Sequence, residues 1–593
     1  MQSLPYFIKK LIQFWSQLNN QRQKQYGFLL VLMIVASFVE IISISMVFPF
    51  LAAITSPIQI FSHPATEPLI RILSLSSPEQ LVLPLTIIFI VVTLAAGCIR
   101  LLLLLANTKL SFSTGSDVSV SIYRKTLYQP YIVHISRNSS EIINGIAIKV
   151  NAVVHITMQT LNILSSIIII IAITTALIYI NPVIALSTIG CFALIFLAIA
   201  VITNKRLLSN GRIVARESTR VLMCLQEGLG GIRDIIIAGN QEAYSQAYLA
   251  ADLPSRRAQG STSFISASPK YVVEAFGMVL IALIAYALTM HSNSSDSTAI
   301  PALGLIVLAG QRLLPNLQQV YGAWASMQGE LASFEDVLEL LSQPIIENVT
   351  NSHTSKLNFV DKIQLRKISY RYNNDAPWII KNLDLTIKAG SCVGFIGVTG
   401  CGKSTLMDII MGLLAPSSGT VLVDGVEVTS INVRYWHQNI AHVPQDIFLI
   451  DNSVAENIAL GKRVGGIDYE KVKFVAQQAK IAETIESWPQ GYDTVVGERG
   501  VRLSGGQRQR LGIARALYYD PTIIIFDEAT SALDTETEED VMKSIAKLND
   551  KLTILIVAHR TTTLKNCDEI IQLGPAGNII RNGTYDQIFN SVE

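Results

Sequence analysis

GFIGVTGCGKST, residues 394–405, has the composition of a loop that holds phosphates. It fits the pattern Gly-x-x-x-x-Gly-Lys-Ser, in which glycines allow several backbone N–H groups to turn toward one anion. The apolar run Cys392–Ile396 predicts a buried strand, and Thr405–Leu414 predicts a helix whose N-terminus faces the phosphates. Because this strand–loop–helix context disfavours a chance glycine-rich turn, the stretch predicts a nucleoside triphosphate site.

The side chains of this loop have separate predicted roles. Lys403 would reach the β and γ phosphates, and the Ser404 hydroxyl would bind Mg²⁺. Cys401 lies near both Lys403 and the start of the helix, which favours a reactive thiolate. The loop residues expected to bind ATP are Gly397, Val398, Thr399, Gly400, Cys401, Gly402, Lys403, Ser404 and Thr405.

The composition of the chain divides it into two parts. The 593 residues are 50% hydrophobic and 15% charged, whereas soluble proteins have roughly 25% charged residues. The long apolar runs lie before residue 325, and the remainder has the composition of a soluble α/β domain. We expect an amphipathic N-terminal elbow helix over residues 1–26, a membrane domain over 27–341, a linker over 342–359 and a nucleotide-binding domain over 360–593.

The net charge and the cysteines give no sign of other partners. The formal net charge is +1, so no nucleic-acid partner is implied. The spacing of the six cysteines matches no metal site, and we expect reduced thiols.

Six apolar segments are long enough to cross a membrane, since about 20 residues span the hydrocarbon core. Basic residues are concentrated in the loops after the second and fourth segments. The loops on the opposite side of the membrane contain a single basic residue, Arg71. By the positive-inside rule, both termini and these two long loops are cytosolic. The sequence of these long loops predicts that the membrane helices continue into the cytosol. The segments lie at residues 27–53, 81–107, 158–180, 183–203, 269–290 and 299–321.

A second group of phosphate-handling residues follows the loop by more than a hundred positions. In TIIIFDEATSALD, residues 522–534, Ile523–Phe526 predicts a buried strand that ends at Asp527 and Glu528. Asp527 would hold Mg²⁺ through water, and Glu528 would polarise the attacking water. Such an acidic pair is weak evidence alone, but after a phosphate loop it predicts ATP hydrolysis.

The stretch LSGGQRQR, residues 503–510, predicts another helix N-terminus suited to an anion. A single domain does not need two such sites for one γ-phosphate, so the simplest explanation is a dimer in which this stretch closes on the partner's ATP. The alternative is an ordinary serine N-cap. The residues expected to bind ATP here are Ser504, Gly505, Gly506 and Gln507.

With these motifs, residues 360–590 resemble the nucleotide-binding domain of an ABC transporter, and the whole chain resembles exporter half-transporters. The resemblance implies a six-helix membrane domain followed by an α/β P-loop ATPase, and a domain-swapped homodimer. It also implies roles for further residues: Tyr372 stacks on adenine, Gln445 is a catalytic residue that also binds Mg²⁺, Glu498 contacts the membrane domain, residues 531–534 with Asp534 form the D-loop, and His559 senses the γ-phosphate. Thr399 and Cys401 replace the more usual serines.

Three functions are compatible with a phosphate loop on such a chain. The first is an ATP-driven exporter or flippase, the second an ATP-gated channel or regulator, and the third an ABC ATPase acting on nucleic acid. Six spans argue against the third, and the intact Glu528 and His559 argue against the second. Segments 128–140 and 223–236 are candidates for coupling ATP hydrolysis to the membrane helices.

Charged residues inside the predicted spans are candidates for cargo contacts, because polar groups in a membrane are costly. A basic zone in the cytosolic half suits an anionic lipid, although snorkelling or pairing between helices explains it equally well. The contexts SPKYVVEAFG and QRLLPNLQQV resemble the branch of lipid-linked oligosaccharide flippases and polysaccharide or glycolipid exporters. We therefore expect such a cargo in a bacterial inner membrane, with multidrug or phospholipid export as the alternative. The candidate residues are Arg100, Lys270, Glu274 and Arg312.

Overall fold

The structure is a computed structural model. It describes residues 3–589 apart from 181, 292–298, 345–356, 463, 530–533, 549–551, 559 and several positions within 47–76. Most side chains over 176–191 and 280–312 also lie outside the described set. The chain divides into two compact units, one of residues 1–129 with 134–345 and one of residues 130–133 with 346–593.

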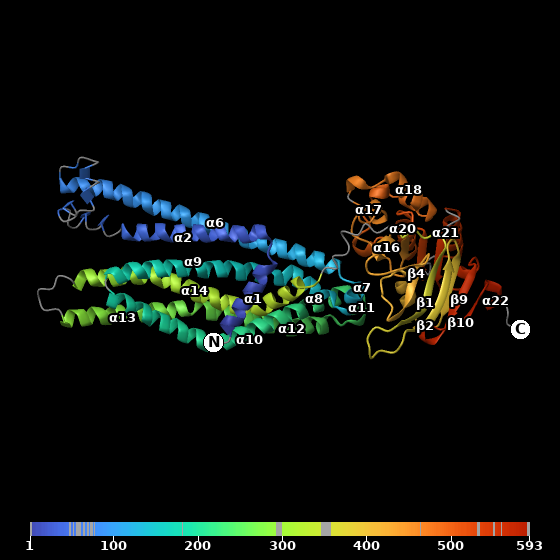
Figure 1. Ribbon diagram of the computed structural model, residues 1–593, viewed down its shortest axis with the longest axis horizontal. Coiled ribbons are helices and arrows are strands. Elements are labelled where there is room, and N and C mark those ends of the chain that lie inside the picture. Colours follow the sequence, from blue (N-terminus) through green and yellow to red (C-terminus); the bar gives the residue numbers. More distant parts are fainter. Residues whose placement is uncertain are drawn as a thin grey trace. The chain divides into compact units, whose positions relative to one another are not determined.

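The first unit consists of long helices (Figure 1). A break at residues 18–19 separates the amphipathic first helix from the second, so the long apolar helix begins before the predicted position 27. A π-helical turn, Gly145–Lys149, joins α8 to α9. The helices are α1 (Ser3–Gln17), α2 (Asn20–Ser45), α6 (Val82–Leu127), α7 (Tyr131–Ser136), α8 (Ser139–Asn144), α9 (Val150–Ile180), α10 (Pro182–Gly230), α11 (Ile232–Ala238), α12 (Gln241–Ala267), α13 (Pro269–His291) and α14 (Ala299–Leu341).

Four helical segments in the described part of the chain are long and apolar enough to cross a membrane: Asn20–Ser43, Pro78–Leu127, Ser139–Thr175 and Phe192–Gly230. They overlap the first four predicted spans. The fifth and sixth predicted spans fall on α13 and α14, where many side chains lie outside the described residues, so these two spans stay predictions.

The surface of α6 shows why it suits a membrane. Leu94, Leu101 and Leu105 are each more than 60% exposed although they are large apolar side chains. Exposed apolar surface of this extent is unfavourable in water and favourable against lipid. Farther along the chain, the same helix becomes polar and buries Ile122 against Val153 and Phe334 in a compact core. The long helices therefore combine a lipid-compatible half with a half that packs as in a soluble protein.

Short helices interrupt the long ones within the predicted coupling segments. α7 lies within residues 128–140, and α11 overlaps residues 223–236. Gly239, with φ of 65°, ends α11 in the left-handed conformation that favours glycine.

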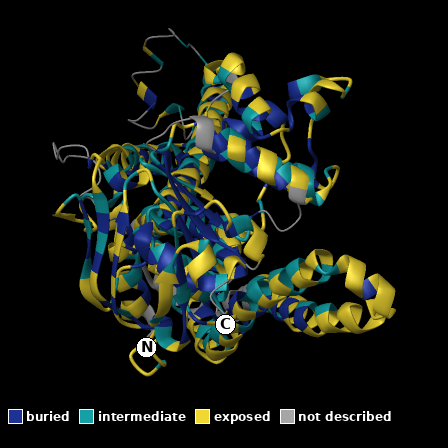
Figure 2. Cartoon of the chain, turned by 90° about the vertical axis from the view of Figure 1, so that its right-hand side faces the viewer, coloured by how far each residue is buried: buried dark blue, intermediate teal, exposed yellow. Residues whose placement is uncertain are grey.

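The second unit contains two sheets with helices, and Figure 2 shows buried residues at its centre and exposed residues on its outer strands. One sheet is antiparallel with the order β2-β1-β4-β5, and the other has the order β10-β9-β3-β8-β7-β6. In the larger sheet only β10 is antiparallel to its neighbour. The strands are β1 (Lys362–Tyr370), β2 (Ile380–Lys388), β3 (Cys392–Gly397), β4 (Ser418–Val423), β5 (Val426–Glu427), β6 (Ile440–Val443), β7 (Ile523–Asp527), β8 (Thr553–Val557), β9 (Glu569–Leu573) and β10 (Ile579–Gly583).

The larger sheet is buried on both faces, which explains its continuous apolar strands. Ile524 and Phe526 of β7 belong to one hydrophobic core, whereas Ile523 and Ile525 belong to the core on the other face. The helices of this unit are α15 (Lys403–Ile410), α16 (Val433–His437), α17 (Val454–Ile458), α18 (Tyr469–Gln478), α19 (Ala482–Glu486), α20 (Gly505–Leu517), α21 (Thr535–Leu548) and α22 (Tyr585–Phe589).

The order of the parallel strands determines where functional residues meet. β3, β8, β7 and β6 are consecutive neighbours, so their carboxyl ends lie along one edge of the sheet. In parallel α/β sheets, ligands bind at this edge. Gly397 ends β3 and Asp527 ends β7, so the phosphate loop and the acidic pair are brought to the same edge.

Candidate nucleotide-binding site

The phosphate loop joins β3 to α15 as predicted. Gly400 and Gly402 have φ of 83° and 100°, a region that side chains rarely adopt. A Cβ on Gly397 would lie 2.4 Å from the backbone oxygen of Leu573, so a side chain cannot be accommodated there. The exposed residues of the loop are Val398, Thr399 and Gly400, followed by the exposed Ser404 at the start of α15. The loop therefore presents its backbone and the first turn of a helix to a ligand.

Lys403 lies beneath this loop and is only 6% exposed. Its ammonium group donates to the backbone oxygens of Gly397, at 2.9 Å, and Val398, at 3.3 Å. The charge is thus held inside the curve of the loop, where phosphate oxygens would be its partners.

The acidic pair at the end of β7 contacts residues from the two neighbouring segments. The Ser404 hydroxyl is close enough to Asp527 to lower the pKa of its carboxyl group. The Gln445 amide donates to the Glu528 carboxylate at 2.9 Å. Glu528 has φ of 53°, a conformation uncommon outside glycine. The structure therefore brings Gln445, two residues beyond β6, to Glu528, which is 83 positions away in the sequence.

Burial raises the pKa of Asp527 above its ordinary value, and hydrogen bonding from Ser404 opposes this effect. A bound cation would favour the ionised carboxylate. The hydroxyl of Ser404, the carboxylate of Asp527 and the amide oxygen of Gln445 are all hard oxygen donors of the kind that Mg²⁺ prefers. The chemistry of these residues fits Mg²⁺, which would be completed by water and the nucleotide's own phosphate oxygens. No cluster of three His, Cys, Asp or Glu side chains suited to a metal occurs among the residues that the structure describes.

Two titratable residues near Asp527 were not predicted from the sequence. Burial raises the pKa of Asp408 to about 6, and the charge of Asp527 adds to this shift. Burial lowers the pKa of His442, which is on β6 beside β7, while Asp527 opposes that change. Asp408 is one helical turn after Ser404, so helical spacing was a usable signal. His442 was not detectable without the strand order.

Replacing Asp408 with asparagine (D408N) is expected to stabilise the chain at neutral pH. Because the folded-state pKa of Asp408 lies above its ordinary value, the ionised carboxylate costs stability, and that cost develops as the pH rises from about 4 to above 6. Thermal unfolding should show D408N above the wild type near neutral pH, with the difference shrinking toward acidic pH. Asp375→Asn, which changes an exposed carboxylate, is the matched control. A D408N effect that does not depend on pH would contradict the assignment.

The LSGGQRQR stretch forms the start of α20. The Ser504 hydroxyl accepts from the Gln507 N–H at 3.3 Å, and the Gln507 side chain accepts from the Ser504 N–H at 2.9 Å. In this reciprocal capping box, the side chains of Ser504 and Gln507 stabilise the N-terminus of α20. Ser504 nevertheless remains exposed, so the helix N-terminus is open to a ligand. The local contacts are thus compatible with both the capping role and the predicted anion site.

Several other predicted residues can be placed only in part. The Tyr372 hydroxyl lies 3.4 Å from that of Thr405, which puts this 43% exposed ring beside the phosphate loop. Asp534 caps α21 by accepting from the Thr537 N–H at 2.9 Å, and this contact is the main reason that its pKa is lowered. Glu498 lies in a short helical turn. His559 and residues 531–533 lie outside the described residues.

The prediction of a reactive thiolate at Cys401 is disfavoured by the structure. The side chain is 3% exposed and packs in the hydrophobic core beneath the loop. This burial limits the access of thiol reagents.

The candidate cargo residues do not form one group. Arg100 of α6 forms an ion pair with Glu40 of α2, so its charge is accounted for by pairing between helices. Lys270 and Glu274 are both exposed on α13. Lys270 lines a cavity of about 280 Å³ together with Gln318 and Tyr321 of α14. The side chain of Arg312 lies outside the described residues.

Comparison with known proteins gives relatives of the second unit and of the whole chain. Residues 380–531 match the family model described as "ABC transporter". The chain is 32% identical to the heterocyst differentiation ATP-binding protein HepA of Nostoc sp. over 68% of this chain and 65% of that protein. It is 28% identical to the ATP-dependent lipid A-core flippase of Ralstonia nicotianae over 80% of both chains.

Two further similarities differ in how much they cover. The alpha-hemolysin translocation ATP-binding protein HlyB of Escherichia coli is 37% identical over 51% of this chain, which spans only 42% of that protein's length. The solved structure of a bacterial Atm1-family ABC exporter with ATP bound superimposes with a TM-score of 0.78 at 20% identity, over 96% of this chain and 97% of that chain. Residues 380–531 therefore match the ABC transporter family model, and the chain as a whole has the fold of a bacterial ABC exporter.

Proposed function

We propose that the chain is one half of an ATP-driven exporter that works as a homodimer with two ATP sites. The observation that carries this proposal is the Gln445–Glu528 contact beside the Ser404–Asp527 contact, at the edge where the phosphate loop lies. A carboxylate that is held by an amide at the edge where the phosphate loop lies suits activation of water. The apolar helices of the first unit supply the membrane part.

In this mechanism, the loop backbone and Lys403 bind the phosphates, and Tyr372 holds the adenine. Glu528 orients and polarises the attacking water, Gln445 fixes the Glu528 carboxylate, and His559 contacts the γ-phosphate. Mg²⁺, held by Ser404, Gln445 and Asp527, would neutralise charge that develops on the phosphate oxygens.

The homodimer follows from the two separate anion-binding helix starts. The exposed N-terminus at Ser504, with Gly505, Gly506 and Gln507, would close on ATP held by the second copy, with Asp534 at the same interface. ATP binding would then bring two ATPase domains together, and hydrolysis would release them. The segments 128–140 and 223–236 would pass this motion to the membrane helices.

The test is ATP-dependent transport by the purified chain in sealed vesicles. Uptake that requires hydrolysable ATP supports an exporter, whereas uptake or ion flow that persists with a non-hydrolysable analogue supports an ATP-gated channel. Cross-linking of the intact chain measures whether two copies associate. Accessibility labelling of both termini tests the predicted cytosolic orientation in a bacterial inner membrane.

For cargo, we propose an amphipathic lipid with an anionic headgroup, of the lipid-linked oligosaccharide or glycolipid class. The flippase of Ralstonia nicotianae, whose name assigns it lipid A-core, is a relative over 80% of both chains. Lys270 supports an anionic group because it lines a cavity in which the Gln318 amide nitrogen is buried and has no hydrogen-bond partner among the residues that the structure describes. Multidrug or phospholipid export is the alternative.

Replacing Lys270 with glutamine (K270Q) is expected to raise the cargo concentration needed to stimulate ATP hydrolysis by about tenfold. The reason is the loss of one charge-assisted hydrogen bond, which contributes on the order of 1.5 kcal/mol. The measurement is ATPase activity against added polyprenyl-pyrophosphate sugar in vesicles. Basal ATPase activity should not change, because Lys270 lies in the membrane unit.

Glu274→Gln is the matched control for K270Q. Glu274 is exposed one turn farther along α13 and does not line the cavity. If K270Q and Glu274→Gln respond equally to cargo, the cavity is not the anion site, and the multidrug or neutral-lipid alternative gains support.

A further inference from the structure

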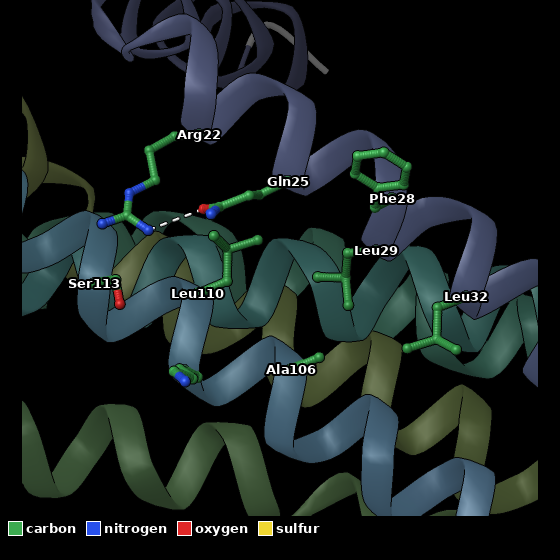
Figure 3. Close-up of a pocket in the computed structure, with 9 residues that line it drawn as sticks. Arg22, Gln25, Phe28, Leu29, Leu32, Ala106, Leu110 and Ser113 are labelled. Atoms are coloured by element: carbon green, nitrogen blue, oxygen red, sulfur yellow. Dashed lines mark hydrogen bonds between the residues drawn. The ribbon is translucent and has the colours of Figure 1, made fainter.

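A groove between α2 and α6 lies outside every site described above. It has a volume of about 280 Å³ and is open along one side (Figure 3). The residues that line it come from two helices that pack side by side. They are Arg22, Gln25, Phe28, Leu29 and Leu32 of α2, with Ala106, Lys109, Leu110 and Ser113 of α6.

The groove is polar at one end and apolar at the other. Arg22, Gln25 and Ser113 lie at the polar end in Figure 3, and Leu32 and Ala106 lie toward the other end. Phe28, 76% exposed, stands along the open side, whereas Leu29 is 4% exposed and forms part of the floor. The polar and apolar ends of the groove correspond to the headgroup and the hydrocarbon chain of a lipid.

The polar end carries one uncompensated positive charge. Arg22 is already satisfied by Asp117, at 2.7 Å, and by Gln25, at 2.9 Å. Lys109 is exposed and makes no hydrogen bond or ion pair with any residue in the described part of the chain. Because Asp117 neutralises Arg22, Lys109 is the group available to an external anion.

The length and position of the groove suit a lipid of one leaflet. The ten residue steps from Arg22 to Leu32 rise about 15 Å along a helix. The five steps from residue 27 to Leu32, about 8 Å, fall within the hydrocarbon core, and the remainder lies at the level of the headgroups. The polar end also coincides with the predicted cytosolic limits of the first two spans, near residues 27 and 107.

We propose that this groove binds one anionic phospholipid, with its phosphate on Lys109 and one acyl chain along Leu29, Leu32 and Ala106. The proposal rests on the membrane placement in the proposed function, but concerns a structural lipid rather than the transported cargo. A soluble anion would leave the apolar part of the groove exposed, and a second copy of the chain would have to supply a carboxylate opposite Lys109. A lipid places an anionic group at the polar end of the groove and a hydrocarbon chain at the apolar end.

The test is photo-crosslinking of the full-length chain in phosphatidylcholine nanodiscs. One sample contains phosphatidylglycerol with a diazirine in its acyl chain, and the other contains phosphatidylcholine with the same acyl chain. Mass spectrometry should find the label on the peptides that contain Phe28, Leu32 or Ala106. Phosphatidylglycerol should label them about five times more than phosphatidylcholine, the ratio expected for one basic residue near an anionic headgroup.

Lys109→Gln should lower labelling by phosphatidylglycerol to the level of phosphatidylcholine, and Lys109→Arg should keep it high. Lys24→Gln is the matched control, because Lys24 is an exposed lysine on α2 that does not line the groove. Basal ATPase activity of the same samples shows that each variant is folded.

Equal labelling by the two lipids in the wild type, or unchanged labelling in Lys109→Gln, would overturn the proposal. Label on other apolar helices but none on these peptides would also overturn it, because another occupant such as a second copy must then cover the groove. The nanodisc offers both leaflets and the readout needs no transport, so failure of the proposed function would not remove the labelling.

Discussion

Replacement of Glu528 by glutamine (E528Q) is expected to reduce ATP hydrolysis by about two to three orders of magnitude or more while ATP still binds. Glutamine keeps the size of the side chain but removes the negative charge that polarises water. Lys403 is held by the backbone oxygens of Gly397 and Val398, so the substitution leaves this phosphate-binding group in place. The measurements are phosphate release and equilibrium binding of ATP to the purified chain.

The substitution also predicts a trapped state. If hydrolysis separates two ATPase domains, E528Q with ATP should accumulate as a closed dimer, detected by cross-linking or by size. Glu536→Gln is a suitable control, since Glu536 is an exposed carboxylate at the start of α21 in the same domain. Near-normal phosphate release by E528Q would mean that another residue activates the water.

The components of the nucleotide site were predictable because each depends on a few consecutive residues. A phosphate loop needs glycines at fixed positions, and these positions are visible in residues 394–405. A buried strand that ends in two acids is equally visible before Glu528. In both cases the local sequence determines the backbone conformation, and that conformation places the groups that carry out the chemistry.

The assembly of these components was not predictable in the same way. Ser404 affects the pKa of Asp527 because β3 and β7 are separated by one strand, β8, that comes later in the sequence than either. The order of the strands in the sheet cannot be predicted from any local sequence pattern. The same reason explains why His442 was missed beside Asp527, whereas Asp408, one turn after Ser404 on a helix, was within reach of a spacing argument.

The membrane unit shows a different limit. Hydropathy located the long helices, because the exposed leucines of α6 are a property of composition. It did not predict which charges are free. Arg100 and Glu40 are 60 residues apart, and they pair because α2 and α6 pack at matching depth. Lys109, a few turns away on α6, has no such partner among the described residues, and the sequence alone did not show this difference in pairing.

Replacement of Lys403 by alanine (K403A) is expected to weaken ATP binding by about a hundredfold or more. Lys403 would form charge-assisted hydrogen bonds to two phosphates, each contributing on the order of 1.5–3 kcal/mol. In the structure its ammonium group is held by the backbone oxygens of Gly397 and Val398, so it is already placed in the loop. Equilibrium binding of ATP measures the effect, and hydrolysis should fall with it.

Lys403→Arg should bind ATP nearly as weakly as K403A. The lysine is 6% exposed inside the loop, and a planar guanidinium needs more room and a different geometry than a compact ammonium. Lys381→Ala, which removes an exposed lysine of β2, should bind normally. ATP affinity within a few-fold of the wild type in K403A would show that the loop backbone alone holds the phosphates. E528Q and K403A thus separate the two steps: the first should retain the nucleotide without hydrolysis, and the second should lose it.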